Sequence, residues 1–161
     1  MTKITWVPSP SFSEGREDRS GTVNTVDFIV IHYIVGTLAA ADQVFSQEES
    51  QVSAHYGIGE GQIHQYVREQ DTAWHAGNFT MNTKSIGIEH SADTDRAPDE
   101  STYKNSIELC VSLCEKYRLD PRTAIIPHSQ VVATLCPGTV DINRIIEGTA
   151  QGVHSQRPTK T

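Results

Sequence analysis

The chain has 161 residues, of which 37% are hydrophobic and 20% are charged, the composition of one ordinary globular domain. The formal net charge of -7 argues against a protein that binds nucleic acid through a basic surface. No apolar run reaches the roughly 18 residues that a membrane-spanning helix needs, so we expect no contact with a membrane.

The first half of the chain predicts an irregular arm followed by a strand, a helix and a hairpin. Residues 1–24 are rich in Ser, Gly, Pro and charge and indicate an irregular N-terminal arm. Residues 26–32 are almost all apolar, which is typical of a strand buried on both faces. Residues 37–45 predict a helix capped by its first threonine. The alternating segments 53–58 and 62–67 flank a Gly-rich joint and predict a β-hairpin.

The second half predicts two further strands and two helices. Residues 85–89 indicate a strand whose glycine allows a close backbone approach. An apolar stripe over 99–118 predicts the longest helix, and 123–126 and 140–147 predict a short strand and a short helix. Residues 148–161 are polar and lack periodicity, so they indicate a tail or a truncated linker. This order of elements predicts an α/β fold with a mixed central β-sheet flanked by helices.

Two histidines and one cysteine suggest a metal site. His32 and His128 each end a predicted strand, where a rigid scaffold can present a side chain to a surface cleft. With Cys136 they make the three-ligand set of a catalytic zinc ion, which leaves a fourth position open. Spacing alone also allows two buried, hydrogen-bonded histidines and an inert thiol. Cys110 and Cys114 lie four apart in the predicted long helix and are expected in the core, so a disulfide framework is not predicted.

Five motifs in a fixed order carry a resemblance to a known family. They are FIVIHY at 28–33 with Gly36-Thr37, VSAHY at 52–56, AWHAG at 73–77, SIGIE at 85–89 after Asn82, and His128 with Cys136-Pro137-Gly138. Over about residues 26–147 the chain resembles the type 2 N-acetylmuramoyl-L-alanine amidases, and it looks most like Gram-positive phage or prophage endolysins. The resemblance implies the amidase type 2 fold and cleavage of the amide bond between N-acetylmuramic acid and L-alanine.

The resemblance also implies roles for particular residues. His32, His128 and Cys136 match the zinc ligands, where some relatives have Asp in place of the cysteine. Glu89 matches the general base that acts on water. Thr134 stands where many relatives carry Lys and is expected to donate a neutral hydrogen bond to the oxyanion.

A further implication of the resemblance is a substrate groove. Trp74, His75 and Asn82 lie in the loop that the family places along this groove, and Tyr33 follows the first predicted ligand. The expected partner is peptidoglycan, both its glycan strand and its stem peptide, and we expect a monomer that holds one Zn2+ ion.

The organisation that follows is an arm over 1–24, a catalytic domain over 25–147 and the tail over 148–161. The first residues lack the apolar stretch of a secretory signal. We therefore expect a protein made in the cytoplasm without a signal peptide that acts at the bacterial cell wall after release. Two alternatives stay open at this point: an inactive peptidoglycan-binding module, and a cytosolic amidase that recycles soluble muropeptides.

Overall fold

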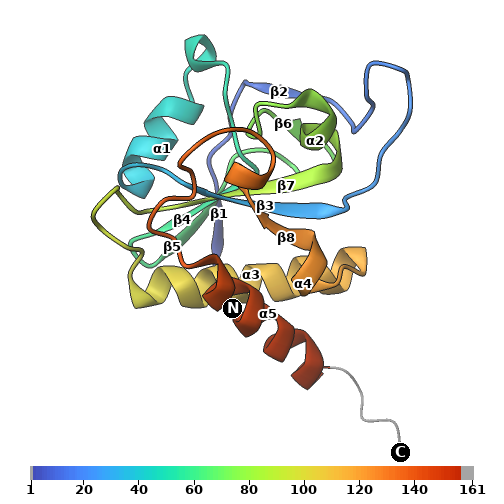
Figure 1. The fold of residues 1–161 in the computed structure, drawn as a ribbon. Helices are drawn as coiled ribbons and strands as arrows, with labels where there is room; N and C mark the ends of the chain where they lie inside the picture. Colours follow the sequence, from blue (N-terminus) through green and yellow to red (C-terminus); the bar gives the residue numbers. More distant parts are fainter. Residues whose placement is uncertain (1, 157–161) are drawn as a thin grey trace, which may run out of the picture.

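The computed structural model describes residues 2–156, so Met1 and residues 157–161 lie outside the described part. A mixed sheet with the strand order β1-β5-β4-β7-β3-β8 forms the centre, and a second, two-stranded sheet pairs β2 with β6. Helices α3 and α5 cover one face of the central sheet, and α1 and α2 lie on the other side (Figure 1). The predicted α/β class is therefore confirmed.

The strands are β1 (Ile4–Trp6), β2 (Phe12–Ser13), β3 (Phe28–Tyr33), β4 (Tyr56–Gly59), β5 (Gln62–Gln65), β6 (Thr72–Ala73), β7 (Ser85–His90) and β8 (Ile125–Pro127). The helices are α1 (Leu38–Phe45), α2 (Phe79–Lys84), α3 (Glu100–Tyr117), α4 (Pro121–Ala124) and α5 (Ile142–Gln156), with 3-10 turns η1 (Glu48–Ser50) and η2 (His128–Gln130). Strand β3 is parallel to both β7 and β8, and β4 and β5 form an antiparallel hairpin.

Strand β7 presents side chains of different size to the two faces of the central sheet. In β7, Ile86 and Ile88 are fully buried in the core cluster that includes residues of α3 and α5. Because successive strand residues point to opposite faces, Gly87 and Glu89 lie on the other side of the sheet. The missing side chain at Gly87 leaves room on that second face, and the candidate site lies there.

Most predicted elements are confirmed with small shifts of their ends. Thr37 caps α1 by accepting a hydrogen bond from the Ala40 N–H, and Asp99 caps α3 in the same way from the Thr102 N–H. The hairpin forms as predicted, although its first strand begins at residue 56. Cys110 and Cys114 are buried in the core, as expected.

The strand predicted at 123–126 is wrong in its first half. Residues 121–124 form helix α4, and β8 begins only at residue 125. Asp120 caps α4 through the Arg122 N–H, and Pro121 occupies the first helical turn. An N-cap aspartate followed by proline is a helix start signal, which outweighs the β-branched residues behind it.

The polar tail expected after residue 147 is also wrong over its described part. Helix α5 continues to residue 156, while 157–161 lie outside the described residues. A Cβ atom at Gly152 would lie 2.5 Å from Val111 Cγ2, and one at Gly148 would collide with Ile107. The two glycines therefore let α5 pack closely against α3, and this contact stabilises a helix that its own sequence favours poorly.

The arm over residues 1–24 is less irregular than predicted. Strand β1 adds to the sheet edge in parallel with β5, and β2 pairs antiparallel with β6. Arg16 is only 7% exposed, and its guanidinium donates hydrogen bonds to the carbonyl oxygens of Glu69, Thr83 and Ser85. The arm is thus joined to the rest of the domain through backbone groups that periodicity in the sequence does not reveal.

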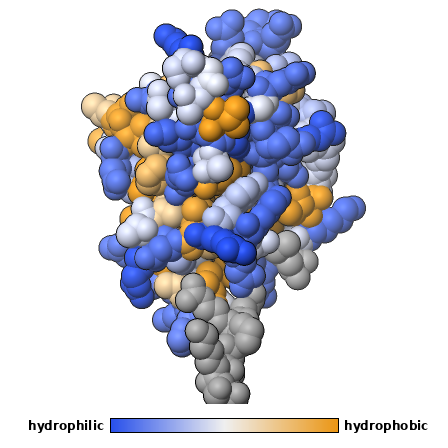
Figure 2. Space-filling model, turned by 90° about the vertical axis from the view of Figure 1, so that its right-hand side faces the viewer, coloured by the Kyte–Doolittle hydropathy of each residue, from blue (hydrophilic) through white to orange (hydrophobic). Residues whose placement is uncertain are grey.

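The face of the molecule in Figure 2 is largely hydrophilic, with apolar side chains interspersed. Scattered exposed apolar residues are normal for globular proteins. Within residues 2–156, no helix combines the length and the apolarity needed to cross a bilayer.

Candidate metal centre

The candidate site begins with two residues that face each other across neighbouring strands. His32 near the end of β3 pairs in register with Glu89 of β7. Paired residues of a parallel sheet point to the same face, so both side chains lie on the glycine-bearing side. The Oε1 atom of Glu89 lies 3.9 Å from His32 Nδ1.

The other two candidate ligands come from the segment that follows β8. Strand β8 pairs with β3, and His128 follows β8 directly as the first residue of η2. The loop then returns, and the Ser129 N–H donates to the Cys136 carbonyl oxygen at 3.0 Å. The Tyr33 N–H donates to Cys136 Sγ at 3.4 Å, which holds the sulfur beside the end of β3.

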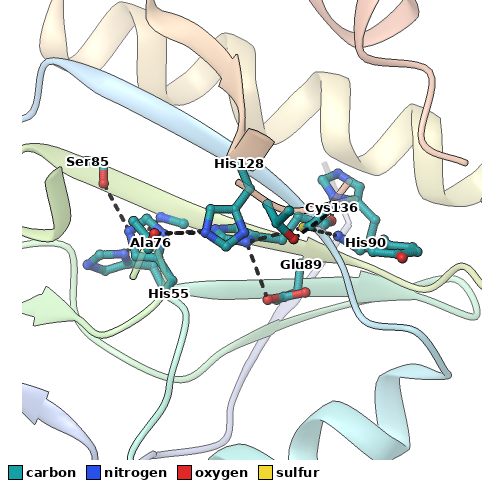
Figure 3. Close-up of polar contacts among 12 residues, drawn as sticks. His55, Ala76, Ser85, Glu89, His90, His128 and Cys136 are labelled. Carbon is teal, nitrogen blue, oxygen red and sulfur yellow. Dashed lines mark hydrogen bonds and ion pairs between the residues drawn. The ribbon is translucent and has the colours of Figure 1, made fainter. Parts of the chain in front are cut away.

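The three predicted ligands converge on one point (Figure 3). One ligand atom from each of His32, His128 and Cys136 lies within 4.8 Å of the others. The His32 Nδ1 and Cys136 Sγ atoms are 3.6 Å apart. Zn–N and Zn–S bonds of about 2.1 and 2.3 Å at a tetrahedral ion separate two such ligands by about 3.6 Å. The donor set and its spacing therefore fit zinc.

The protonation of His32 suits a cation, whereas that of Cys136 has to change when a cation binds. Burial, and secondarily the neighbouring His128 and His90, hold the pKa of His32 well below its ordinary value, so its ring is neutral. Burial raises the pKa of the Cys136 thiol to about 12. A thiol ligates as the thiolate, so binding of a cation has to displace this proton.

His128 presents one ring nitrogen to the site. Its Nε2 atom lies 2.8 Å from the Ala76 carbonyl oxygen. A carbonyl can only accept, so Nε2 carries the proton and Nδ1 keeps its lone pair. The structure thus leaves the lone pair of His128 available for a metal ion.

Glu89 is a largely buried carboxyl group with an unused oxygen. Burial raises its pKa to about 8. Among the residues that the structure describes, its Oε2 atom is buried without a hydrogen-bond partner. A buried carboxylate with a raised pKa beside a ligand cluster is typical of a group that moves protons.

Thr134 and Tyr33 both lie beside Cys136. Thr134 is exposed, and its Oγ1 accepts a hydrogen bond from the Cys136 N–H at 3.2 Å. Its hydroxyl proton therefore stays available for donation. The Tyr33 ring occupies the space where a side chain at Gly138 would stand, so this ring supports the Cys136 loop. The substrate contact predicted for Tyr33 stays a prediction.

The three remaining predicted groove residues are tied to the protein itself. Asn82 is 6% exposed, and its Oδ1 accepts from the His75 and Ala76 N–H groups. Trp74 is half-buried, and its indole N–H donates to Ser13 Oγ of the arm. Both ring nitrogens of His75 have partners, His32 Nε2 at 2.9 Å and Ser85 Oγ at 3.0 Å. These contacts make His75 and Asn82 supports of the site, with no polar atom of His75 left for a substrate.

The sequence analysis did not predict a role for Ala76 or Ser85. Ala76 contacts the candidate ligand His128, and Ser85 contacts His75. Ala76 acts through its backbone carbonyl, so its residue type carries no signal. Ser85 begins a strand, where a serine is unremarkable. Only the proximity of distant segments shows the role of either residue.

Comparison with known proteins agrees with this geometry. Residues 22–139 match the family described as N-acetylmuramoyl-L-alanine amidase. The chain belongs to this family. It is 35% identical over 118 residues to N-acetylmuramoyl-L-alanine amidase A of Achromobacter lyticus, a match that covers 69% of this chain and 61% of that protein. It is also 30% identical over 95 residues to the amidase CwlL of Bacillus licheniformis, covering 53% of this chain and 26% of CwlL.

Solved amidase-family structures share the fold. A selenomethionine derivative of AmpD superposes with a TM-score of 0.74 at 23% identity, covering 92% of this chain and 95% of AmpD. A mutant endolysin from Bacillus subtilis superposes with a TM-score of 0.72 at 20% identity, covering 95% of this chain and 99% of the endolysin. The predicted amidase type 2 fold is confirmed. The chain spans less than two thirds of the length of the amidases from A. lyticus and B. licheniformis.

Proposed function

We propose that this chain is a zinc-dependent N-acetylmuramoyl-L-alanine amidase that hydrolyses the amide bond between N-acetylmuramic acid and the L-alanine of the stem peptide. The observation that carries this proposal is the convergence of two histidines and a cysteine beside a buried carboxyl group. Family membership, over residues 22–139, supplies the bond that is cut.

His32, His128 and Cys136 would hold the zinc ion. Catalytic zinc sites typically have three protein ligands and an open fourth position, whereas structural zinc sites have four protein ligands. When bound, zinc supplies Lewis acidity toward a water molecule and toward the scissile carbonyl group.

Glu89 acts as the proton carrier. Its unpartnered Oε2 takes a proton from the attacking water as the water oxygen bonds to the lactyl carbonyl carbon. The same carboxyl group then gives this proton to the alanine nitrogen as the C–N bond breaks. The products are a free lactyl carboxylic acid on the sugar and a free amine on the stem peptide. The remaining water proton leaves the carboxylic acid for the amine or for bulk water, so atoms and protons balance.

Thr134 is the hydrogen-bond donor to the carbonyl oxygen as that oxygen gains negative charge. Its hydroxyl proton is available because its oxygen already accepts from the Cys136 backbone. A neutral hydroxyl stabilises an oxyanion less than a cationic lysine would, so most of this stabilisation comes from the Lewis acid.

Peptidoglycan is the proposed partner, and the bacterial cell wall is the proposed place of action. Several relatives are described as endolysins, and this description supports an enzyme that acts on intact walls. An inactive binding module would lack a ligand or the general base, whereas here all four residues converge.

The test is amine release from purified Gram-positive cell walls. We expect new N-terminal alanine groups with the zinc-loaded protein and none after chelation, with recovery when zinc is returned. Cys136→Ser should abolish both zinc stoichiometry and amine release. Cys114→Ser is the matched control, because it alters another buried thiol that lies outside the site. Full amine release from the chelated protein, or from Cys136→Ser, would overturn the proposal.

A second substrate separates wall lysis from muropeptide recycling. Soluble muropeptide fragments are assayed beside intact walls at the same enzyme concentration. We expect walls to be cleaved efficiently. Cleavage of the fragments alone would show that the enzyme class is right and the proposed place of action is wrong.

A further inference from the structure

One dipeptide lies behind both candidate histidine ligands. The His75 ring contacts His32 Nε2 at 2.9 Å, and the Ala76 carbonyl contacts His128 Nε2 at 2.8 Å. Figure 3 shows Ala76 and Ser85 on the side of the ligand cluster away from His90. Two adjacent residues from the loop before α2 thus reach both rings at the nitrogen that does not face Cys136.

A chain of hydrogen bonds fixes the direction of every proton between α2 and His32. Ser85 Oγ lies 2.7 Å from the Met81 carbonyl, which can only accept, so the serine donates to it. Ser85 Oγ then accepts from His75 Nε2–H, which leaves the lone pair of His75 on Nδ1. That lone pair accepts from His32 Nε2–H. The lone pair of His32 is therefore on Nδ1, the atom that lies 3.6 Å from Cys136 Sγ.

The His75 ring has little freedom to leave this position. It packs so closely over β7 that a Cβ atom at Gly87 would lie 2.5 Å from its Cγ. The backbone N–H groups of His75 and Ala76 both donate to Asn82 Oδ1. Both the ring and the backbone of the dipeptide are thus held before any ion binds.

We propose that His75 is a positioning residue that holds His32 in the Nε2–H tautomer and so presents its Nδ1 lone pair to the metal ion. This inference rests on the proposed function, because the ion is the proposed zinc. A hydrogen bond to the second nitrogen of a ligating histidine orients the ring and increases its basicity, and its loss weakens metal binding by about 10- to 100-fold. Ser85 has the same effect at one step further away.

A matched pair of variants tests the acceptor alone. The variants His75→Asn and His75→Leu introduce side chains that are nearly equal to each other in size and shape. Only asparagine retains a hydrogen-bond acceptor close to the position of Nδ1. Zinc affinity is measured at one pH by competition with a chelating dye, and thermal unfolding of the metal-free proteins checks the fold. We expect about 10- to 100-fold weaker zinc binding in His75→Leu and near wild-type binding in His75→Asn. Equal affinities in the two variants would overturn the proposal.

The tautomer of His32 can also be measured directly in the metal-free protein, which gives a second test of the proposal. Long-range proton–nitrogen NMR spectra of the metal-free wild type should show His32 protonated on Nε2, and Ser85→Ala should introduce the Nδ1–H form. A wild-type His32 protonated on Nδ1 would overturn the positioning role even if zinc binds. Absence of zinc binding by the wild type would instead reject the proposed function, while the NMR result still decides the role of His75.

Discussion

Glu89 has glycines as neighbours on its face of the sheet, both on the adjacent strand and on its own strand. Gly57 of β4 pairs with it in register, and Gly87 stands two residues earlier on the same strand. A Cβ atom at Gly57 would lie 2.7 Å from Tyr66 Oη and 2.9 Å from Leu38 Cδ1. Tyr66 and Leu38 therefore pack over Gly57, next to Glu89. Burial raises the pKa of Glu89 to about 8.

The first prediction concerns the carboxyl group itself. Glu89→Gln keeps the volume of the side chain but removes the proton carrier, so amine release should fall by about 10²- to 10⁴-fold. Zinc stoichiometry should be unchanged, because the three ligands are intact. Rates on cell walls, measured with zinc analysis of the same sample, check this. Activity within a factor of about ten of wild type would place the general base elsewhere.

The second prediction concerns the hydroxyl group of Thr134. Thr134→Val keeps the shape and removes the donor, so kcat should fall by about tenfold, less than the 10²- to 10³-fold typical of a principal oxyanion donor. Thr134→Ser should restore the rate, because it retains the hydroxyl group. Steady-state kinetics on walls compare the two variants; equal rates would show that the hydroxyl does not act.

At the scale of elements, the contact between α5 and α3 depends on two helical glycines. Gly148 and Gly152 are four residues apart and share one face of α5, against Ile107 and Val111 of α3. Each costs about 1 kcal/mol of helix stability relative to alanine. The close packing of the two helices offsets this cost, so α5 is stable in the fold although its isolated sequence is a poor helix former.

A substitution at Gly152 separates these two effects. Gly152→Ala improves helix propensity but places a methyl group 2.5 Å from Val111 Cγ2, so we expect a net loss of about 1–3 kcal/mol in the free energy of unfolding. The exposed neighbour Gln151→Ala is the control and should change stability by less than about 0.5 kcal/mol. Urea unfolding measures both. A stabilised Gly152→Ala variant would show that the helices can separate freely.

At the scale of the whole molecule, Glu69 joins three parts of the fold. Its carboxylate accepts hydrogen bonds from Tyr56 of β4 and from Tyr117 and Lys116 of α3, the latter two at 2.7 and 2.9 Å. Its carbonyl oxygen accepts from Arg16 of the arm. Burial alone would raise the pKa of Glu69, but the hydrogen bonds from Lys116 and the two tyrosines outweigh burial and hold the pKa below its usual range.

The fourth prediction follows from this lowered pKa. A carboxyl group whose pKa is lower in the folded state stabilises the fold above its unfolded pKa of about 4.3. This stabilisation is lost as the pH falls through the folded pKa. Glu69→Gln should therefore lower the free energy of unfolding by about 2–3 kcal/mol at neutral pH, and the gap to wild type should shrink progressively below about pH 4.

Denaturant unfolding at several pH values measures this gap, with the exposed Glu49→Gln as the control. The control should show a small difference that changes little with pH. A gap between wild type and Glu69→Gln that stays constant down to about pH 3 would mean that the ionised form of Glu69 does not stabilise the fold.

The sequence by itself determined the elements whose signals are local. Strand β3, helix α1, the hairpin and helix α3 follow from alternation, apolar stripes and caps that lie within each element. The ordered motifs also predicted the family, and with it the ligand set His32, His128 and Cys136, which the fold brings within reach of one ion.

Tertiary structure alone decided the features that depend on residues far apart in the chain. The short strand β1 exists because it pairs with β5, and α5 extends to residue 156 because its glycines pack against α3. The His75 ring points toward His32 because it packs over Gly87 and forms a hydrogen bond with Ser85, both of strand β7. A local sequence pattern indicates the propensity of a segment but not the segment that it packs against. For β1, α5 and His75, the contacts with that distant segment supplied the free energy that fixed the structure.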